Sequence, residues 1–340
     1  MSRFANRHIS SVLLGLLLAV SVSVASNAHA AEAERRETFD FKTWSIQRIT
    51  LPQAGQPAVS YYLSPPKTRA PLVLFVQGSG CIAPFSGLGT DNRSASIFPY
   101  VGLAMSGRFA VMAVDKPYQT AGRQDGEPNG ALDCSAAFNK HYSYDTWLAT
   151  LRTALQHALA RPDVDPSRVL VVGMSEGGVL AAGLARAMPQ VSAVALVGSS
   201  GTTQLYDMIA STYQGSGNDA DKLRELQSID AVVKQIMAEP DSVAKFAWGH
   251  TYRRWSSFLA QSPGDNLLQS KARVYIASGM QDKSVPILST EVMFAQLRMR
   301  GRDVTMVRVP GGSHDLLTEA GGREQVQQEY DAIIRWFEGK

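Results

Sequence analysis

The sequence has few of the residues that hold metals or form redox centres. Its 340 residues include two cysteines and six histidines, and no spacing among them is that of a zinc site. No loop of the form G-x-x-x-x-G-K follows a strand-like run, so there is no sign of a phosphate-binding P-loop. The sequence therefore implies neither a metal nor an organic cofactor.

Charged residues are also scarce, at 19% of the chain against 45% hydrophobic residues. This is the composition of a folded globular protein and not of a disordered one. The formal net charge of +3 is small, which argues against a nucleic-acid partner. The length suits one large domain or two smaller ones.

A membrane-spanning run is missing as well, because the uncharged stretch Val12–Ala25 is shorter than the ~20 residues that a spanning helix needs. The stretch follows a basic start and precedes a small-residue site ending at Ala30, which is the pattern of a secretory signal peptide. We expect residues 1–30 to be removed and residues 31–340 to act in the periplasm or outside a bacterial cell, without stable membrane insertion. An uncleaved membrane anchor is the alternative.

The two cysteines, Cys81 and Cys134, are candidates for a disulfide in such an oxidising compartment. A bridge between positions so far apart would add roughly 4 kcal/mol to stability in the chain-entropy model. We expect the bridge to form. Two unpaired buried thiols are the alternative, because spacing in the sequence does not give the geometry.

Strand-like runs alternate with helical patterns along the rest of the chain, after a charged linker at residues 31–37. Several runs are aliphatic without alternation, which is typical of strands covered on both faces of a parallel sheet. The alternation predicts an α/β domain with a mainly parallel sheet. The predicted strands are residues 44–51, 58–63, 71–77, 108–115, 168–173, 191–198, 273–279 and 303–310, and the main predicted helices are residues 144–160, 177–188, 221–237, 287–300 and 323–339.

One interval, about 202–266, breaks this alternation. It contains amphipathic helical patterns and no convincing strand. An insertion of this size between two strands predicts a helical cap over one edge of the sheet. Sites in such folds lie at the carboxyl ends of the parallel strands, where insertions gather.

One motif joins a strand-like run to a helix-like run. Residues 173–177 read G-x-S-x-G, directly after a predicted strand and directly before a predicted helix. Such a tight turn exposes the hydroxyl of Ser175 at the carboxyl end of the strand. The helix that follows directs its amino terminus at the same point, which favours negative charge there. Ser175 is therefore the predicted nucleophile, although glycine and serine are also common in ordinary turns.

A serine hydroxyl needs a base, and the base needs an acid that orients it. Among the histidines, His314 is the best candidate, because it stands in a glycine-rich loop between a predicted strand and the final helix. Asp282 follows another predicted strand and is the predicted acid, with an ordinary turn aspartate as the alternative. Asp315 is adjacent to His314, but neighbouring side chains point in different directions, so we expect a loop or helix-cap residue there.

Acyl transfer also needs N–H donors for the oxyanion that forms on the attacked carbonyl. The backbone N–H of Glu176 is one predicted donor. The second is expected in the loop FVQGSGC, with Ser79 as the first choice and Gly80 as the second. An ordinary glycine turn is the alternative for this loop.

These motifs resemble those of the α/β-hydrolase superfamily. The resemblance rests on the elbow at 173–177, on GMQDKSVP and on GGSHDL, and the strand order extends it over nearly all of the mature chain. The GxSxGG elbow with a late helical insertion is similar to dienelactone hydrolases, prolyl-oligopeptidase-type domains and exported bacterial esterases. The resemblance implies a mostly parallel central sheet flanked by helices, with the nucleophile, acid and histidine at Ser175, Asp282 and His314. Gln77 departs from it, since many members have histidine before the oxyanion glycine.

The side chain of Glu176 has two interpretations. An acid in the first turn of a helix is favoured by the helix dipole, which is the interpretation we prefer. Alternatively, the carboxylate binds a cationic group of the substrate. Arg253 and Arg254 are candidates to bind a substrate carboxylate, but exposed basic pairs seldom have so specific a role.

Aromatic residues in the predicted cap, Trp248, Tyr252 and Trp255, are the predicted substrate-binding residues. Their helical spacing fits equally well with a helix face packed on the domain. Both interpretations are compatible with one another.

The sequence thus predicts an exported serine hydrolase that cleaves a carboxylic ester, on a small molecule or a short peptide, through an acyl-enzyme. A serine peptidase, amidase or thioesterase with the same triad is the nearest alternative. A hydrolase-fold binding protein without catalysis is a remote one, because all three members of the triad are present.

Overall fold

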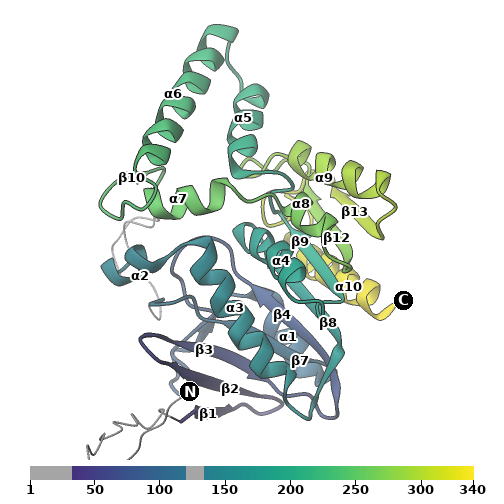
Figure 1. The fold of residues 1–340 in the computed structure, drawn as a ribbon. Coiled ribbons are helices and arrows are strands. Elements are labelled where there is room, and N and C mark those ends of the chain that lie inside the picture. Colours follow the sequence, from purple (N-terminus) through teal and green to yellow (C-terminus); the bar gives the residue numbers. More distant parts are fainter. Residues whose placement is uncertain (1–32, 120–133) are drawn as a thin grey trace, which may run out of the picture. The chain divides into compact units, whose positions relative to one another are not determined.

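The computed structural model describes residues 33–119 and 134–340, so the predicted signal peptide, residues 1–30, lies outside the described residues. A nine-stranded sheet runs through the chain in the order β1-β2-β3-β7-β4-β8-β9-β12-β13 (Figure 1). The first three strands pair antiparallel and β3 joins β7 antiparallel, whereas all pairings from β7 to β13 are parallel. The strands are β1 (Arg35–Asp40), β2 (Ser45–Gln53), β3 (Gln56–Ser64), β4 (Ala70–Val76), β7 (Ala110–Val114), β8 (Val164–Met174), β9 (Ala193–Val197), β12 (Arg273–Gly279) and β13 (Val304–Val309).

The aliphatic runs become strands that are buried on both faces, as expected. In β4, Leu72 and Leu74 belong to one core, while the alternate residues Val73 and Phe75 belong to another. The two cores therefore lie on opposite faces of the sheet, because successive side chains of a strand point to opposite sides. The predicted α/β architecture with a mostly parallel sheet is confirmed.

Helices cover both faces of this sheet. The first core includes side chains of α3, α4, α8 and α9, and the second includes side chains of α1 and α10. The helices outside the cap are α1 (Phe98–Ser106), α2 (Ala136–His141), α3 (Tyr144–Leu159), α4 (Glu176–Ala187), α8 (Pro263–Leu268), α9 (Ile287–Met299) and α10 (Gly322–Glu338). In the described residues, no helix combines the length and the apolar character that crossing a membrane requires.

The predicted helical insertion contains α5 (Gln204–Gln214), α6 (Asp219–Ala238), the short strands β10 (Phe246–Ala247) and β11 (His250–Thr251), and α7 (Tyr252–Leu259). We call α5 to α7 the cap. In Figure 1, α5 and α6 form an antiparallel pair at the top of the view, and α7 runs beneath them. The insertion was predicted to extend to about residue 266, but α8 packs against α4 and α9 and belongs to the helical layer on the sheet.

The charged segment at residues 31–37, predicted to be a linker, is partly a strand. β1 begins at Arg35 and pairs with β2 at the edge of the sheet. Most of its residues are exposed, so it has no hydrophobic pattern, and charged side chains are usual on an edge strand.

A disulfide between Cys81 and Cys134 joins the loop after β4 to the residues just before α2. It closes a separation of 53 residues. The predicted bridge is therefore confirmed.

Two further short strands, β5 (Phe85–Ser86) and β6 (Ser94–Ala95), pair with each other in the segment between the two cysteines.

Candidate active site

Ser175 lies in a strained turn between β8 and α4. Its φ of 52° and ψ of −124° are unusual for a residue with a side chain, and such a conformation costs about 1–3 kcal/mol. The turn brings chain segments so close together that a Cβ on Gly177 would lie 2.2 Å from the carbonyl oxygen of Val76. The side chain of Ser175 does not cap α4, so its hydroxyl is not committed to the helix.

Asp282 and His314 form a hydrogen-bonded pair at the carboxyl ends of β12 and β13. His314 Nδ1 lies 2.8 Å from Asp282 Oδ2. The other carboxylate oxygen accepts the backbone N–H groups of Ser284 at 2.8 Å and Val285 at 2.9 Å. The Asp282 side chain is 2% exposed and that of His314 is 33% exposed. A fixed, buried carboxylate therefore orients an imidazole that reaches solvent.

Asp315, the neighbour of His314 in sequence, takes no part in this pair. It accepts a hydrogen bond from Ser313 Oγ at 2.5 Å, which makes it a loop residue.

The end of β9 brings the histidine loop and the elbow to the same place. Ser175 N donates to Val197 O at 2.9 Å, and a Cβ on the next residue, Gly198, would lie 2.2 Å from the carbonyl oxygen of His314. Ser175, Asp282 and His314 thus lie together at the carboxyl ends of the parallel strands. In the described residues no hydrogen bond joins the Ser175 hydroxyl to His314, and such bonds are often long without substrate.

The two predicted oxyanion donors lie close to this serine. Ser79 and Glu176 line the same cavity as Ser175, and a Cβ on Gly78 would lie 3.3 Å from the Cβ of Ser175. Within residues 33–119 and 134–340, neither backbone N–H of this pair donates a hydrogen bond. Both are therefore available to a carbonyl oxygen placed beside the serine.

The cavity beside Ser175 has a volume of about 550 Å³. Its wall is mixed in character, with aromatic and aliphatic side chains on one hand and hydroxyl, amide and charged groups on the other. It is lined by Ser79, Ser175, Glu176, Gln204, Asp207, Met208, Ser211, Thr212, Glu225, Ile229, Trp248, Arg254, Trp255, Ser284 and Val285. The cap thus supplies most of one wall, and the sheet loops supply the reactive residues.

Of the three predicted substrate-binding aromatics, Trp248 and Trp255 line this cavity, with their ring centroids 5.3 Å apart in an edge-to-face arrangement. Tyr252 does not line it. Tyr252 is buried in the core of the cap beside Ile236, and its hydroxyl donates to Gln235 at 3.2 Å. Tyr252 begins α7 one turn before Trp255, and its ring packs on α6 and does not reach the cavity.

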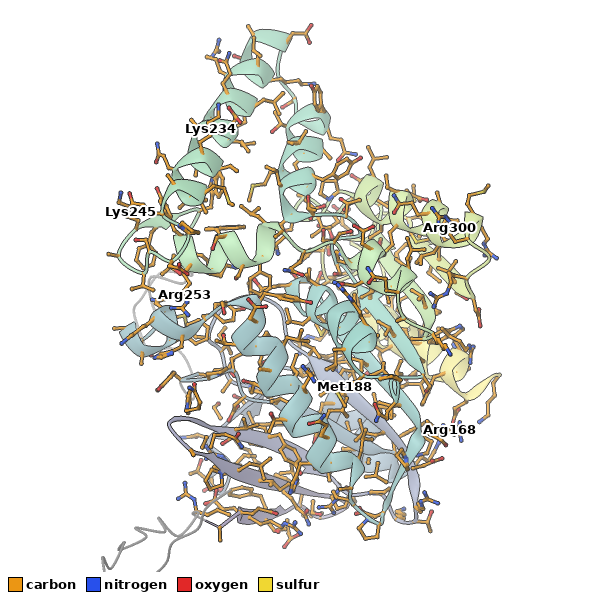
Figure 2. The ribbon with its side chains drawn as sticks, in the orientation of Figure 1. Arg168, Met188, Lys234, Lys245, Arg253 and Arg300 are labelled. Atoms are coloured by element: carbon orange, nitrogen blue, oxygen red, sulfur yellow. A yellow bond between two sulfur atoms is a disulfide. The ribbon has the colours of Figure 1, made fainter. Side chains whose placement is uncertain are left out.

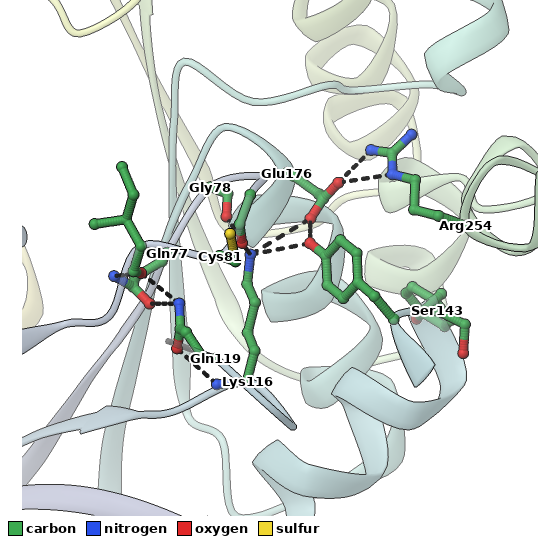
Figure 3. A network of polar contacts seen from close by, with 12 residues as sticks. Gln77, Gly78, Cys81, Lys116, Gln119, Ser143, Glu176 and Arg254 are labelled. Atoms are coloured by element: carbon green, nitrogen blue, oxygen red, sulfur yellow. Dashed lines mark hydrogen bonds and ion pairs between the residues drawn. The ribbon is translucent and has the colours of Figure 1, made fainter. Parts of the chain in front are cut away.

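The carboxylate of Glu176 is buried and paired within the protein (Figure 3). Arg254 Nε donates to it at 3.1 Å, and the Tyr142 hydroxyl and a second Arg254 nitrogen also donate to it. Lys116 Nζ lies 3.9 Å away. The helix-dipole interpretation is therefore incomplete, and the carboxylate is occupied by groups of the protein.

Arg254 is 3% exposed and is not part of a surface basic pair with Arg253. Burial alone would raise the pKa of Glu176, but the charges of Arg254 and Lys116 outweigh it and lower the pKa to about 2. Burial lowers the pKa of Lys116 to about 8, although Glu176 opposes this shift. The carboxylate of Glu176 is therefore ionised at neutral pH.

Sequence reasoning missed Lys116 and Tyr142. The sequence indicates the place of Lys116, because this residue stands two residues after the fully buried strand β7 and so lies, like Ser175, at the carboxyl end of a parallel strand. In the described residues there is no group of three or more histidine, cysteine, aspartate or glutamate side chains that could hold a metal ion.

A serine elbow at the end of a parallel strand, with an Asp–His pair on the following strand ends, is the arrangement of an α/β-fold hydrolase. The chain belongs to the α/β hydrolase family, whose family model matches residues 73–327. One curated relative, the α/β hydrolase domain-containing protein WAV2 of Arabidopsis thaliana, is 27% identical over 171 residues, covering 48% of this chain and 46% of the relative. The match thus spans about half the length of that relative.

Solved structures share the fold at low sequence identity. Acetyl xylan esterase 1 from Thermoanaerobacterium sp. JW/SL YS485 is similar with a TM-score of 0.55 and 15% identity, covering 87% of each chain. The acylaminoacyl peptidase of Pyrococcus horikoshii is similar with a TM-score of 0.57 and 14% identity, covering 88% of this chain and 42% of that one.

Proposed function

We propose that the protein is a serine hydrolase that cleaves carboxylic esters through a Ser175–His314–Asp282 triad. The observation that carries the proposal is the hydrogen-bonded pair of Asp282 and His314 at 2.8 Å, placed at the sheet edge where the strained elbow presents Ser175 to a cavity. Each group has the environment that its role requires, because the acid is buried and fixed while the base is accessible.

In the proposed reaction, Ser175 Oγ attacks the ester carbonyl while His314 takes the hydroxyl proton through Nε2. Asp282 holds the imidazole through Nδ1 and stabilises its positive charge. The N–H groups of Ser79 and Glu176 donate to the oxyanion. The tetrahedral intermediate collapses as His314 protonates the leaving alcohol, and water then releases the acid from the acyl-enzyme by the same steps.

The cavity favours a substrate that carries polar groups beside its ester. Gln204 and Asp207 lie one turn apart on α5 and bring an amide and a carboxyl group to the cavity wall. Such acceptors suit hydroxyl or N–H donors of a ligand. Two solved structures that share the fold are named acetyl xylan esterases, and an ester substrate of this kind is consistent with those names.

Peptide or amide cleavage is the second candidate, because acylaminoacyl peptidase and a puromycin-hydrolysing peptidase also share the fold. The triad serves either bond, and the leaving group decides between them. Export is part of the proposal as well, and the Cys81–Cys134 disulfide supports an oxidising compartment.

The test is labelling with a fluorophosphonate probe, followed by a panel of ester and peptide substrates. Wild type should label and Ser175→Ala should not, and esters should turn over faster than the matching amides. An unlabelled wild type, or equal labelling of the variant, contradicts the serine mechanism. Faster turnover of amides would assign the protein to the peptidases. Cell fractionation with sequencing of the mature N-terminus tests export after Ala30.

A further inference from the structure

Lys116 is a buried cation whose three donors are all used inside the protein. The residue is 2% exposed. Its Nζ donates to Gly78 O at 2.6 Å, to Gly80 O at 2.8 Å and to the Tyr142 hydroxyl at 2.9 Å (Figure 3). A buried ammonium is unfavourable unless it is paired and hydrogen-bonded, so this residue type at this place needs an explanation.

The two carbonyls that Lys116 holds flank the N–H of Ser79. The carbonyl of Gly78 and the N–H of Ser79 belong to one planar peptide unit, so fixing the oxygen fixes the direction of the N–H. Glycines stand on both sides of Ser79, and Gly80 has a φ of 88°. Peptide units next to glycine rotate with little steric resistance, so without a clamp this N–H would sample other directions.

The same network reaches the second donor and the cap. Glu176, whose backbone N–H is the other proposed oxyanion donor, pairs through its carboxylate with Lys116 and with Arg254 of α7. Tyr142 bonds both Lys116 and Glu176. A single buried cluster therefore connects both sides of the oxyanion hole to the helix that also bears Trp255.

A second clamp holds the far side of the loop. Lys116 N donates to Gln119 Oε1 at 2.8 Å, and Gln119 Nε2 donates to Gln77 Oε1 at 3.3 Å. Gln77 Nε2 in turn donates to Ile82 O at 3.1 Å. The glutamine that departs from the family pattern thus has a structural partner, and residues 77–82 are tied at both ends.

We propose that Lys116 is a positioning residue that holds the Gly78–Ser79 peptide with its N–H directed at the carbonyl under attack. The proposal rests on the serine hydrolase function above. The cation acts through the peptide unit and does not touch the substrate. Its positive charge also polarises that peptide, which makes the Ser79 N–H a stronger donor in the transition state.

The test compares Lys116→Met with wild type on p-nitrophenyl acetate, with Lys234→Met as the matched control. Lys234 lies on α6 in an exposed ion pair with Asp230 (Figure 2). Since loss of one oxyanion donor lowers kcat about 10²-fold or more, Lys116→Met should lower kcat about 10²-fold, with KM within about threefold. The affinity for a boronic acid, which forms a tetrahedral anion on serine, should fall in parallel.

A purely structural role predicts a different pattern. It would lower the amount of folded protein and the unfolding midpoint while kcat per titrated Ser175 stays near wild type, and that result overturns the proposal. If Lys116→Met yields no folded protein, Lys116→Gln replaces it. Its amide is uncharged, one bond shorter and has two N–H donors for three acceptors, so kcat should fall by a smaller factor than in a full loss of the donor, and a kcat equal to wild type overturns the proposal. A wild type that neither labels at Ser175 nor turns over esters would instead contradict the proposed function.

Discussion

The two sides of Ser175 are built in different ways. On one side, His314 is a third exposed and depends on one hydrogen bond to Asp282. On the other side, the loop at residues 77–82 is held by a buried ion cluster, an amide pair and a disulfide. The difference follows from the work that each side does. A base must exchange protons with water and substrate, whereas oxyanion donors stabilise charge only if they are already in position.

The largest expected effect breaks the exposed side. His314→Ala should lower kcat at least ~10⁴-fold, because the nucleophile loses its base. The unfolding free energy should change by less than about 1 kcal/mol, because the imidazole is partly exposed and makes one contact of this strength. Steady-state kinetics and urea unfolding measure the two quantities. The control is His157→Ala, because the His157 side chain is also about a third exposed, at 32%, and lies away from the site. A similar kcat loss in that control would contradict the assignment.

Removing the disulfide tests the buried side. Cys81→Ser with Cys134→Ser should lower the unfolding free energy by about 4 kcal/mol in the chain-entropy model. We also expect kcat to fall several-fold, because Cys81 follows the oxyanion loop directly. Thermal unfolding with and without a reductant is the measurement, and the reductant should change wild type but not the double variant. Equal midpoints for wild type and variant would show that the bridge does not stabilise this side.

The pH dependence of stability sharpens the comparison through His250. Burial lowers the pKa of His250 to about 4, with Arg254 adding to the shift and Glu176 opposing it. In the unfolded chain the pKa of the histidine is near 6.5, so below that pH the unfolded state binds more protons than the folded state. The contribution of the neutral, buried His250 to the free energy of unfolding is therefore present above about pH 6.5 and is lost toward pH 4. Between pH 7 and pH 4, the free energy of unfolding of His250→Gln should fall by up to about 3 kcal/mol less than that of wild type.

The measurement is the difference between the two unfolding curves at pH 7 and pH 4. A difference curve is needed because burial raises the pKa of Asp207 and of Asp115 to about 6, which acts with the opposite sign. A difference that does not change with pH would contradict the buried, neutral histidine.

The smallest expected effect concerns the cap wall. Asp207→Asn should raise KM about tenfold for acetyl esters of polyhydroxylated alcohols, because the new amide changes a buried acceptor that suits ligand hydroxyls. The KM for p-nitrophenyl acetate, which lacks those hydroxyls, should not change. Glu225→Gln is the matched control, since Glu225 lines the same cavity but is exposed. Equal KM shifts for both esters would contradict a hydroxyl-binding role for α5.

Much of the fold could be predicted because its signals are local. The aliphatic runs of β4, β7 and β9 are buried on both faces of the sheet. The elbow at 173–177 shows where β8 ends, because the close approach of its backbone leaves no room for a side chain at Gly173 and Gly177. β1 escaped prediction because an exposed edge strand needs no hydrophobic alternation. The candidate triad could be proposed because each of its members follows a parallel strand, β8, β12 or β13, and parallel strands end on the same side of the sheet.

The ion cluster could not be predicted, because its members come from distant segments. Lys116 follows β7, Tyr142 follows α2, and Arg254 lies in the cap. Arg254 stands next to Arg253 in the sequence, so the two residues are expected to form an exposed basic pair. Only the packing of α7, with Trp255 and Phe258 against the guanidinium, shows that it is buried. The pairing energy that offsets this burial exists only in the folded chain.

The most direct test of the account is to identify the residue that carries the acyl group during turnover. Wild-type enzyme is mixed with p-nitrophenyl acetate, quenched in acid within the first turnovers and digested for mass spectrometry. The account predicts an acetyl group on Ser175 in the wild type and none in Ser175→Ala. Turnover with an acetyl group on a different residue, or with none on Ser175, would contradict it.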